Sequence, residues 1–418
     1  MTWTRRQYRP PGSRPAQGSR AGDGYVKIWV WREGAKAGIR SAPMIDSGDD
    51  DDRLDRAAQR HEDAIALRER GSYPAAAEAC DEAVQIFEEV EGSDSPNLAN
   101  ALIERGRILD LMDRHAEAEA ALERAGVILR PLIASGPDHD ALSPEVLEDL
   151  TRLTLRAEGA LVSVIRKRGR LAEAAARAEA LVRWADTVLP AHDLAIAEAL
   201  NDLGVIYKFQ GRFADAEAVY QRALRIVEAG EGGPDALATL MHNLGGLAHS
   251  RGDFAAGEPM ARRAVELRES AYGRGHPVVA ADIEAWGALL EGLGQLPQAE
   301  HAYAEALATF DSTLGPDSLE AASSASALAS VHQSLGRRDE ALAEYERARA
   351  IREAKLGPLH FDLGLTLNNL GMLLQELERP ADARVAIARA LAIFEASLGP
   401  EHPHTRAAAA NLAALAAS

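Results

Sequence analysis

The sequence predicts an all-α protein, an α-solenoid of about eight helix-turn-helix repeats. Three observations support this fold class. A turn residue recurs at a nearly constant interval, apolar residues recur at helical spacing within each interval, and small residues recur where two helices have to meet. The composition agrees with a folded chain, because 47% of the 418 residues are hydrophobic and 26% are charged.

The turn residue, most often glycine, recurs from residue 53 to the end of the chain. The interval is 42 residues in five of the seven steps, 41 residues in one step and 56 residues in another. Self-similarity at a fixed period is the signature of a repeat architecture, so the chain contains eight copies and one insertion of fourteen residues. The turn residues are Gly71, Asp113, Gly169, Gly211, Gly252, Gly294, Gly336 and Glu378.

Each copy contains two stretches with the periodicity of a helix. In the fourth copy the first stretch places Ile196, Leu200, Leu203 and Tyr207 on one helical face. Gly211 then ends the helix, because glycine adopts the left-handed conformation that a helix stop requires. The second apolar stripe consists of Phe213, Ala216, Tyr220, Ala223 and Val227. A short turn between the two helices makes the pair antiparallel.

Small residues recur at three offsets from the turn. Ala or Gly lies five residues after it in every copy, and Ala lies twelve residues after it in all copies but one. Gly or Ala also lies seven residues before the turn, except in the third copy, which has Val162 and fits the pattern worst. Two helix backbones approach closely where a side chain is small. We expect the larger residues nine positions after the turn to fill the space beside that contact: Leu122, Tyr220, Tyr303, Tyr345 and Ile387.

These residues together resemble the tetratricopeptide repeat, whose pattern has Leu-Gly, Tyr, a turn Gly, Ala, an aromatic residue and Ala at fixed offsets. The 42-residue period, the helix sequence Asn368-Asn369-Leu370-Gly371 and the loop Leu356-Gly357-Pro358-Leu359-His360 are similar to the kinesin-light-chain variety of this repeat. The resemblance covers residues 53–418. It implies a right-handed superhelix in which the first helix of each pair lines a concave face.

The resemblance also implies which side chains face that groove, namely those ten, six and three residues before each turn. The candidates for binding a peptide or partner are Arg68, Arg107, Arg166, Asn201, Lys208, His242, Glu284, Asn368 and Gln375. Asn201 and Asn368 are the best candidates for holding a peptide backbone, because an amide side chain both donates and accepts hydrogen bonds. The alternative interpretation is that these polar side chains only solvate a helix face.

The charges of these candidates change along the groove. The N-terminal half is cationic through Arg68, Arg107, Arg166 and Lys208, whereas the middle is acidic through Glu284. Arginine and lysine favour carboxylate groups on a ligand. We therefore expect a protein or peptide partner with acidic segments in the N-terminal half of the groove.

The residues suited to other functions are few. The single cysteine, Cys80, occupies the position of Tyr220 and Tyr303 in other copies, so we interpret it as a core thiol. We expect no catalytic residues, cofactor or metal, and therefore no enzyme. The net charge of −18 and the lack of a continuous basic stripe argue against nucleic acid as a partner. No apolar run reaches the roughly 18 residues of a membrane span, and we expect a cytoplasmic protein that binds no membrane.

The first 52 residues differ in composition from the repeats. Residues 1–43 carry nine basic and two acidic residues, a net charge of +7, whereas the remainder carries −25. We therefore predict a disordered tail over residues 1–52, basic to residue 43 and acidic at 49–52, and a repeat domain over residues 53–418. Translation from Met44 instead of Met1 is an open alternative.

Two functional hypotheses follow. The first is an adaptor or scaffold for protein–protein interaction, which binds a peptide or a partner protein in the concave groove. The second is a regulatory module in which the tail docks on the array and a partner displaces it, since the acidic run Asp49–Asp52 is opposite in sign to the cationic half of the groove.

The insertion near residues 131–144 is the main irregularity of the array. Its Pro and Gly content predicts a loop, and Ser143-Pro144-Glu145 predicts the start of a helix that reaches about residue 168. The insertion either fills a gap beside the weak third copy or forms a protrusion for a specific partner.

Overall fold

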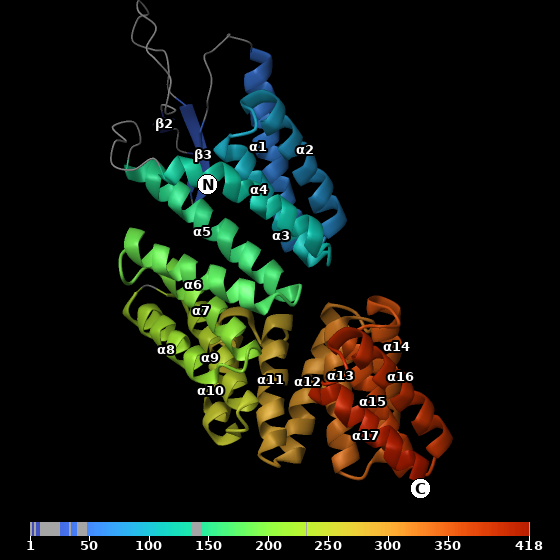
Figure 1. Ribbon diagram of the computed structural model, residues 1–418. Coiled ribbons are helices and arrows are strands. Elements are labelled where there is room, and N and C mark those ends of the chain that lie inside the picture. The colour runs from blue at the N-terminus through green and yellow to red at the C-terminus, as the bar shows by residue number, and fades with distance from the viewer. Residues whose placement is uncertain are drawn as a thin grey trace, which may run out of the picture. The chain divides into compact units, whose positions relative to one another are not determined.

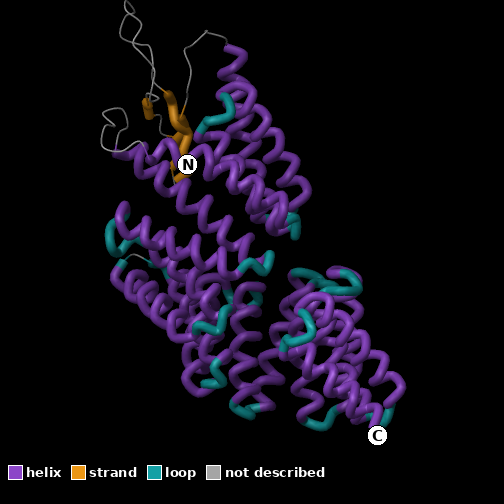
Figure 2. The backbone as a smooth tube through the Cα atoms, viewed as in Figure 1, coloured by secondary structure: helices purple, strands orange, loops and turns teal. Residues whose placement is uncertain are grey.

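The computed structural model describes residues 2–3, 6–8, 26–32, 35–39, 48–134, 144–230 and 232–417. From residue 48 onward the described residues form helices joined by short turns and loops (Figures 1 and 2). The chain divides into two compact units, Met1–Ile226 and Val227–Ser418, which we describe separately. The predicted all-α repeat fold is therefore confirmed for the repeat region.

The first unit contains four helix pairs after its N-terminal strands. Within the pairs, α1 packs on α2, α3 on α4, and α5 on α6. The helices are α1 (Gly48–Glu69), α2 (Tyr73–Glu91), α3 (Pro96–Leu111), α4 (His115–Ala134), α5 (Pro144–Lys167), α6 (Leu171–Val188), α7 (Leu194–Phe209) and α8 (Phe213–Ala229), the last of which contains the boundary between the units.

The second unit continues with four further pairs and a terminal helix. The helices are α9 (Pro234–Ser250), α10 (Phe254–Tyr272), α11 (Pro277–Gly292), α12 (Leu296–Thr313), α13 (Leu319–Ser334), α14 (Arg338–Leu356), α15 (Phe361–Glu376), α16 (Pro380–Leu398) and α17 (Pro403–Ala417). None of the helices among the described residues combines the length and apolarity needed to cross a membrane.

The N-terminal region contains four short strands, β1 (Thr2–Trp3), β2 (Arg6–Tyr8), β3 (Val26–Arg32) and β4 (Ala35–Ile39). They form one sheet in the order β1-β4-β3-β2, in which β1 and β4 are parallel and the other two pairs are antiparallel. The tail predicted as disordered therefore differs from the structure at these strands. The alternating β-branched and aromatic residues of β3 explain the difference, because such residues favour strands. The remaining residues before 48 lie outside the described part of the chain.

The predicted tail also differs from the structure at its C-terminal end. Helix α1 begins at Gly48, and its first turn contains Asp49, Asp50 and Asp51. Acidic side chains stabilise the N-terminus of a helix, where the helix dipole is positive. The acidic run thus belongs to the first repeat helix.

The turn within each helix pair is made by the residue that the repeat pattern identifies. All eight of these residues have a positive φ, between 56° and 78°. Six are glycines, which adopt this conformation without strain. The other two, Asp113 and Glu378, are the only non-glycine residues with a positive φ in the described part of the chain.

Five of the loops between successive pairs follow a second rule. A glycine with a positive φ ends the second helix of one pair, and the residue three positions later caps the first helix of the next pair. His276 and His360, for example, accept hydrogen bonds through Nδ1 from the backbone N–H groups of Val278 and Asp362, both at 3.2 Å. The glycine–cap pairs are Gly92 and Ser95, Gly273 and His276, Gly315 and Ser318, Gly357 and His360, and Gly399 and His402.

The close contact inside each pair joins the residue seven before the turn to the residue nine after it. A Cβ atom built on Gly204 would lie 2.7 Å from Cζ of Tyr220, and one built on Gly106 would lie 2.8 Å from Cδ2 of Leu122. The predicted role of the large residue is therefore confirmed. The third copy reverses the sizes, because its Val162 is matched by Ala178, and both side chains are 1% exposed.

The first helices of successive pairs also touch one another. In the first unit α1 contacts α3, α3 contacts α5, and α5 contacts α7, and in the second unit the same relation holds from α9 to α17. Each unit therefore presents a continuous layer of first helices.

The insertion lies between α4 and α5 and is partly helical. Helix α4 extends to Ala134 and includes Pro131, and α5 begins at Pro144. The predicted loop is therefore shorter than residues 131–144 at its N-terminal end, and its residues 135–143, with the predicted cap Ser143, lie outside the described residues.

Candidate functional site

The candidate site is a cavity of about 960 Å³ in the first unit. It is formed mainly by the first helices α1, α3, α5 and α7, so it lies on the layer that the repeat pattern predicts to bind ligands. Its lining contains four arginines and six carboxylic acids together with apolar side chains. The charged lining residues are Arg68, Glu69, Glu104, Arg107, Glu148, Asp149, Arg152, Arg156, Glu198 and Asp202.

Glu104 of α3 is the most buried charge of the cavity. Its side chain is 0% exposed and accepts hydrogen bonds from Arg68 of α1 and, at 3.4 Å, from Arg107 of its own helix. A buried carboxylate is strongly destabilising unless it is paired in this way. Because both partners lie on the cavity wall, Glu104 fixes the positions of two of its four arginines.

His61 of α1 is also buried near this pair, and its exposed fraction is 7%. Burial lowers the pKa of His61 to about 4, although the charge of Glu104 opposes this and Arg156 adds to it. The imidazole is therefore neutral at physiological pH. His61 is therefore a buried neutral group beside Glu104 and adds no positive charge near the cavity.

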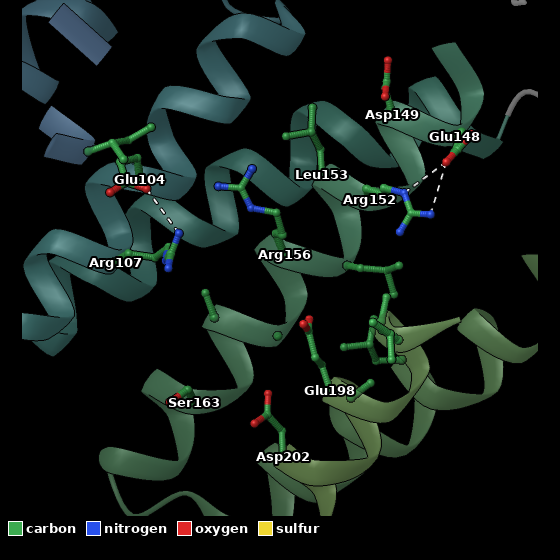
Figure 3. A pocket seen from close by; sticks show the side chains of 18 of the residues that line it. Glu104, Arg107, Glu148, Asp149, Arg152, Leu153, Arg156, Ser163, Glu198 and Asp202 are labelled. Atoms are coloured by element: carbon green, nitrogen blue, oxygen red, sulfur yellow. Dashed lines mark hydrogen bonds and ion pairs between the residues drawn. The ribbon is translucent and has the colours of Figure 1, made fainter. Parts of the chain in front are cut away.

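Arg156 of α5 stands in the middle of the cavity, with Glu104 on one side and Glu198 on the other (Figure 3). Burial lowers the pKa of this guanidinium, and the positive charges of Arg107 and Arg68 lower it further. No described residue forms a hydrogen bond or an ion pair with Arg156. A guanidinium with a planar fork of donors is thus left without a protein acceptor.

The fourth arginine, Arg152, differs from Arg156 in being paired. It lies one turn earlier on α5, donates to Glu148 at 3.2 Å and also donates to Asp193 at 3.1 Å. Asp193 in turn caps α7 by accepting from the N–H of Ala195. Arg152 therefore connects two neighbouring first helices and has little positive charge left for a ligand.

The opposite wall of the cavity is acidic. Glu198 and Asp202 lie four residues apart on α7, which places them on one helical face (Figure 3). Burial raises the pKa of Asp202 to about 6, and the neighbouring charge of Glu198 raises it as well, whereas Arg166 and a hydrogen bond from Asn201 act in the other direction. The ionised form of Asp202 therefore has an unfavourable environment in this wall.

Two of the candidates predicted in this unit line the cavity, and three are not part of its lining. Arg68 and Arg107 line it, as described above. Arg166 and Lys208 lie over the ring of Phe209, at 5.6 and 5.8 Å from its centroid, and the Phe209 side chain is 58% exposed. Asn201 bonds to Asp202. The half that was predicted as cationic thus contains acids as well.

The candidates in the second unit are engaged with neighbouring helices. His242 of α9 bonds through Nδ1 to Asp282 at 2.7 Å, and Asp282 also accepts two bonds of 3.0 Å from Arg268. Glu284 accepts from Ser323 and Ser324, both at 2.6 Å.

Two further candidates lie on α15. Asn368 accepts through Oδ1 from Asn411 of α17 at 3.1 Å, whereas Gln375 is half-buried. The same contact with α17 occupies the amide oxygen that was predicted to hold a peptide backbone.

The predicted groove positions do not include Glu104, Arg156, Glu198 and Asp202. They lie nine or thirteen residues before their turns, whereas the expected positions were ten, six and three before. In α3 the residue ten before the turn, Ile103, is 0% exposed and belongs to the core. Continuing the helical spacing from positions three and six to nine and thirteen would have found all four residues.

Comparison with known proteins agrees with the repeat pattern. The tetratricopeptide repeat profile matches residues 52–125, 153–229, 279–354 and 362–418, and a second tetratricopeptide repeat profile matches residues 237–278. The chain belongs to the tetratricopeptide repeat family. The predicted family is thus confirmed for most of the chain.

Several solved structures are similar to this tetratricopeptide repeat protein. BtubC (BKLC) from P. vanneervenii is 24% identical, with a TM-score of 0.44 over 57% of this chain and 93% of that one. Kinesin light chain TPR-like repeats from Podosopora anserina are 20% identical, with a TM-score of 0.42 over 49% of this chain and 97% of that one. The apo form of RapI is 14% identical, with a TM-score of 0.51 over 71% of this chain and 97% of that one. No curated protein matches the sequence.

Proposed function

We propose that this tetratricopeptide repeat protein is an adaptor whose first unit binds an extended segment of a partner protein in the cavity along α1, α3, α5 and α7. The observation that carries the proposal is the cavity of about 960 Å³ with an unpaired guanidinium at its centre. A cavity of this size accommodates several side chains of a bound segment.

The lining supports binding better than catalysis. Glu104 is paired with Arg68 and Arg107, and Arg152 is paired with Glu148, so these pairs hold half of the charged lining residues in fixed positions. Fixed polar groups on rigid helices reduce the entropy that is lost when a ligand is ordered. The second hypothesis, docking of the tail, has less support because the acidic run forms the first turn of α1.

Site-specific photocrosslinking tests the proposal in the full chain. A photoreactive amino acid replaces Ser163, which is half-buried on α5 and lines the cavity. The matched control carries it at Val127, which is 62% exposed on the second helix α4. After irradiation in extract from the source cells, we expect the Ser163 variant to yield discrete crosslinked proteins that the Val127 variant does not. Equal products at both positions would refute the assignment of the cavity.

A further inference from the structure

One buried hydroxyl of the repeat array has no hydrogen-bond partner. Three copies place a tyrosine nine residues after the turn, as Tyr220, Tyr303 and Tyr345, and all three side chains are at most 2% exposed. A buried tyrosine hydroxyl normally finds a partner. Tyr303 donates to Glu291 at 3.0 Å, and Tyr345 is hydrogen-bonded to Ser330. The hydroxyl of Tyr220 bonds to nothing within the described part of the chain.

A comparison of the copies explains this difference. Glu291 lies three residues before the turn of the sixth copy, and Lys208 occupies the same position in the fourth copy. The sixth copy therefore offers its tyrosine a carboxylate, whereas the fourth offers an ammonium group, which only donates hydrogen bonds. The same position of the third copy holds a second cation, Arg166.

These two cations lack a negative partner. Arg166 and Lys208 lie beside the same ring, that of Phe209, and neither forms an ion pair or a hydrogen bond with a described residue. Burial lowers the pKa of Lys208, and the positive charge of Arg166 lowers it further. By contrast Lys167, the neighbour of Arg166, is paired with Asp110 at 2.8 Å. Two partly buried cations thus repel each other without compensation.

We propose that Tyr220, Arg166 and Lys208 form a carboxylate subsite, which takes an acidic side chain of the bound segment. The ligand carboxylate would stand to Tyr220 as the carboxylate of Glu291 stands to Tyr303 in the sixth copy. This inference rests on the proposed function and names the chemistry of one position of the bound segment.

The carboxylate subsite lies on helices that form the cavity. Ser163 of α5 and Asp202 of α7 line the cavity. Arg166 follows Ser163 by three residues and Lys208 follows Asp202 by six, which is about 5 Å and about 9 Å along the helix axes. An extended chain covers this distance with about two or three residues. A segment that fills the cavity therefore reaches the subsite towards the turn ends of α5 and α7.

The three donors suit a carboxylate. Its two oxygens accept several hydrogen bonds at once, and a guanidinium binds both of them in parallel. The sixth copy demonstrates this capacity, because Glu291 accepts from Tyr303 and also from Ser330 at 2.8 Å. A tyrosine in this position does not need to be exposed, since Tyr303 is 2% exposed and still holds its carboxylate.

A single negative charge fits the subsite better than a phosphate dianion. Burial raises the pKa of Tyr220, the negative charge of Asp202 raises it further, and the positive charge of Arg166 lowers it. Asp202 therefore acts on the subsite and partly offsets Arg166 and Lys208. Two cations and one carboxylate leave one positive charge, which one ligand carboxylate neutralises.

End-blocked synthetic peptides test the proposal with the full chain. Each short peptide holds one Glu at a varied position in an uncharged background and carries a fluorophore for anisotropy measurements. Control peptides replace the Glu by Gln, and a further set has no Glu but a free C-terminal carboxylate. We expect at least one Glu peptide to bind about 10- to 100-fold more tightly than its Gln control, the range of a hydrogen bond to a charged group. The free C-terminus should give no such gain.

Substitutions of the three donors locate the carboxylate. We expect Arg166→Met, Lys208→Met and Tyr220→Phe each to reduce the preference for Glu over Gln by about 10-fold. Tyr220→Phe is the most informative variant, because loss of a hydroxyl that has no partner should not destabilise the free protein. Tyr345→Phe is the matched control, and it should keep the full preference. Circular dichroism checks that each variant is folded.

Lys208→Glu tests the comparison with the sixth copy directly. It introduces a carboxylate at the position of Glu291, so the protein itself would supply the acceptor for Tyr220. We expect this variant to lose the preference for Glu peptides. We also expect the amides of α7 and α8 to exchange more slowly with solvent than those of Lys208→Gln, which removes the same cation and adds no carboxylate.

Three results would overturn the carboxylate subsite. The first is a wild-type protein that does not prefer any Glu peptide over its Gln control, including one that binds no peptide of the set. The second is a Tyr220→Phe variant with the full preference, and the third is a gain that only the free C-terminus provides. Crosslinking at Ser163 is a separate test, so a crosslinked partner combined with charge-indifferent peptides would refute the subsite and leave the adaptor function standing.

Discussion

The replacement Gly204→Ala tests how closely the two helices of a repeat approach. Gly204 lies on α7, seven residues before the turn, and the added Cβ would lie 2.7 Å from Cζ and 2.8 Å from Cδ1 of Tyr220. The Tyr220 side chain is 0% exposed, so its ring has no free space to move into. The two helices must therefore separate, or the ring must tilt.

The expected change in the free energy of unfolding is the sum of two opposing contributions. Overpacking of a core contact costs about 1–3 kcal/mol, and alanine gains about 1 kcal/mol over glycine in helix propensity. The seventh copy shows that an alanine can coexist with a tyrosine, since Ala329 and Tyr345 occupy the same two positions there. We therefore expect a net destabilisation of about 1 kcal/mol, near the lower end of the range.

Gly245→Ala is the matched control, because the partner nine residues after its turn is small. A Cβ on Gly245 would lie 3.3 Å from Cβ of Ala261, which requires only a slight adjustment. We expect this variant to be neutral or more stable by about 0.5 kcal/mol, through the gain in helix propensity.

Hydrogen exchange measured by mass spectrometry is the suitable assay, because repeat arrays do not unfold in a single two-state step. The amides of α7 and α8 should exchange faster in Gly204→Ala, and those of α9 and α10 should be unchanged or slower in Gly245→Ala. If the amides of α7 in Gly204→Ala are protected from exchange as strongly as the amides of α9 in Gly245→Ala, the contact between Gly204 and Tyr220 does not limit how closely the helices pack.

Three further predictions concern charges and turns. Asp282→Asn should destabilise the second unit by about 3 kcal/mol in local hydrogen exchange, because Asp282 is 1% exposed and holds both Arg268 and His242; unchanged protection of α9 and α11 would contradict this. Glu378→Gly should stabilise the last repeat by about 0.5–1 kcal/mol, because Glu378 has a φ of 56° that costs a residue with a side chain more than it costs glycine; Glu378→Ala is the control and should show no such gain in urea unfolding. Asp202→Asn should stabilise the first unit by about 1–2 kcal/mol at pH 7.5, because a carboxyl group whose folded pKa is raised to about 6 is destabilising when ionised; this advantage should disappear as the pH falls from 6 to 4, and a difference that grows towards pH 4 would refute the sign.

Much of the fold was predictable because each copy of the repeat must satisfy the same turn and packing requirements. The turn positions could be assigned from glycine spacing, and even the non-glycine turn residues Asp113 and Glu378 adopt the same left-handed backbone. The size exchange between Val162 and Ala178 was not predicted, because the sequence pattern does not show that the residue seven before the turn packs directly against the residue nine after it. The strands in residues 2–39 were not predicted, because the short β-branched and aromatic run of β3 lies in a segment whose basic composition indicated disorder.

The candidate site was predictable in its location and less so in its residues. The pattern indicated the first helices as the binding layer, and Arg68 and Arg107 line the cavity there. The rotation of each helix about its axis decides whether the ninth or the tenth residue before the turn faces the layer, and a single sequence does not give that rotation. The ion pairs of the site were also not predictable from the repeat pattern, because they join side chains of different repeats. Glu104, for example, accepts a hydrogen bond from an arginine of the preceding repeat.

The complementary sizes seven before and nine after the turn restrict which segments of this chain are interchangeable. A single helix exchanged between the third repeat and a repeat with a small–large pair would bring two bulky side chains, or two small ones, to the same crossing; α8 placed after α5, for example, would set Tyr220 against Val162. A whole hairpin carries both partners with it. The hairpin is therefore the smallest cassette that can be duplicated, deleted or transplanted without repacking, and shuffled arrays made from this chain should be cut in the glycine–cap loops.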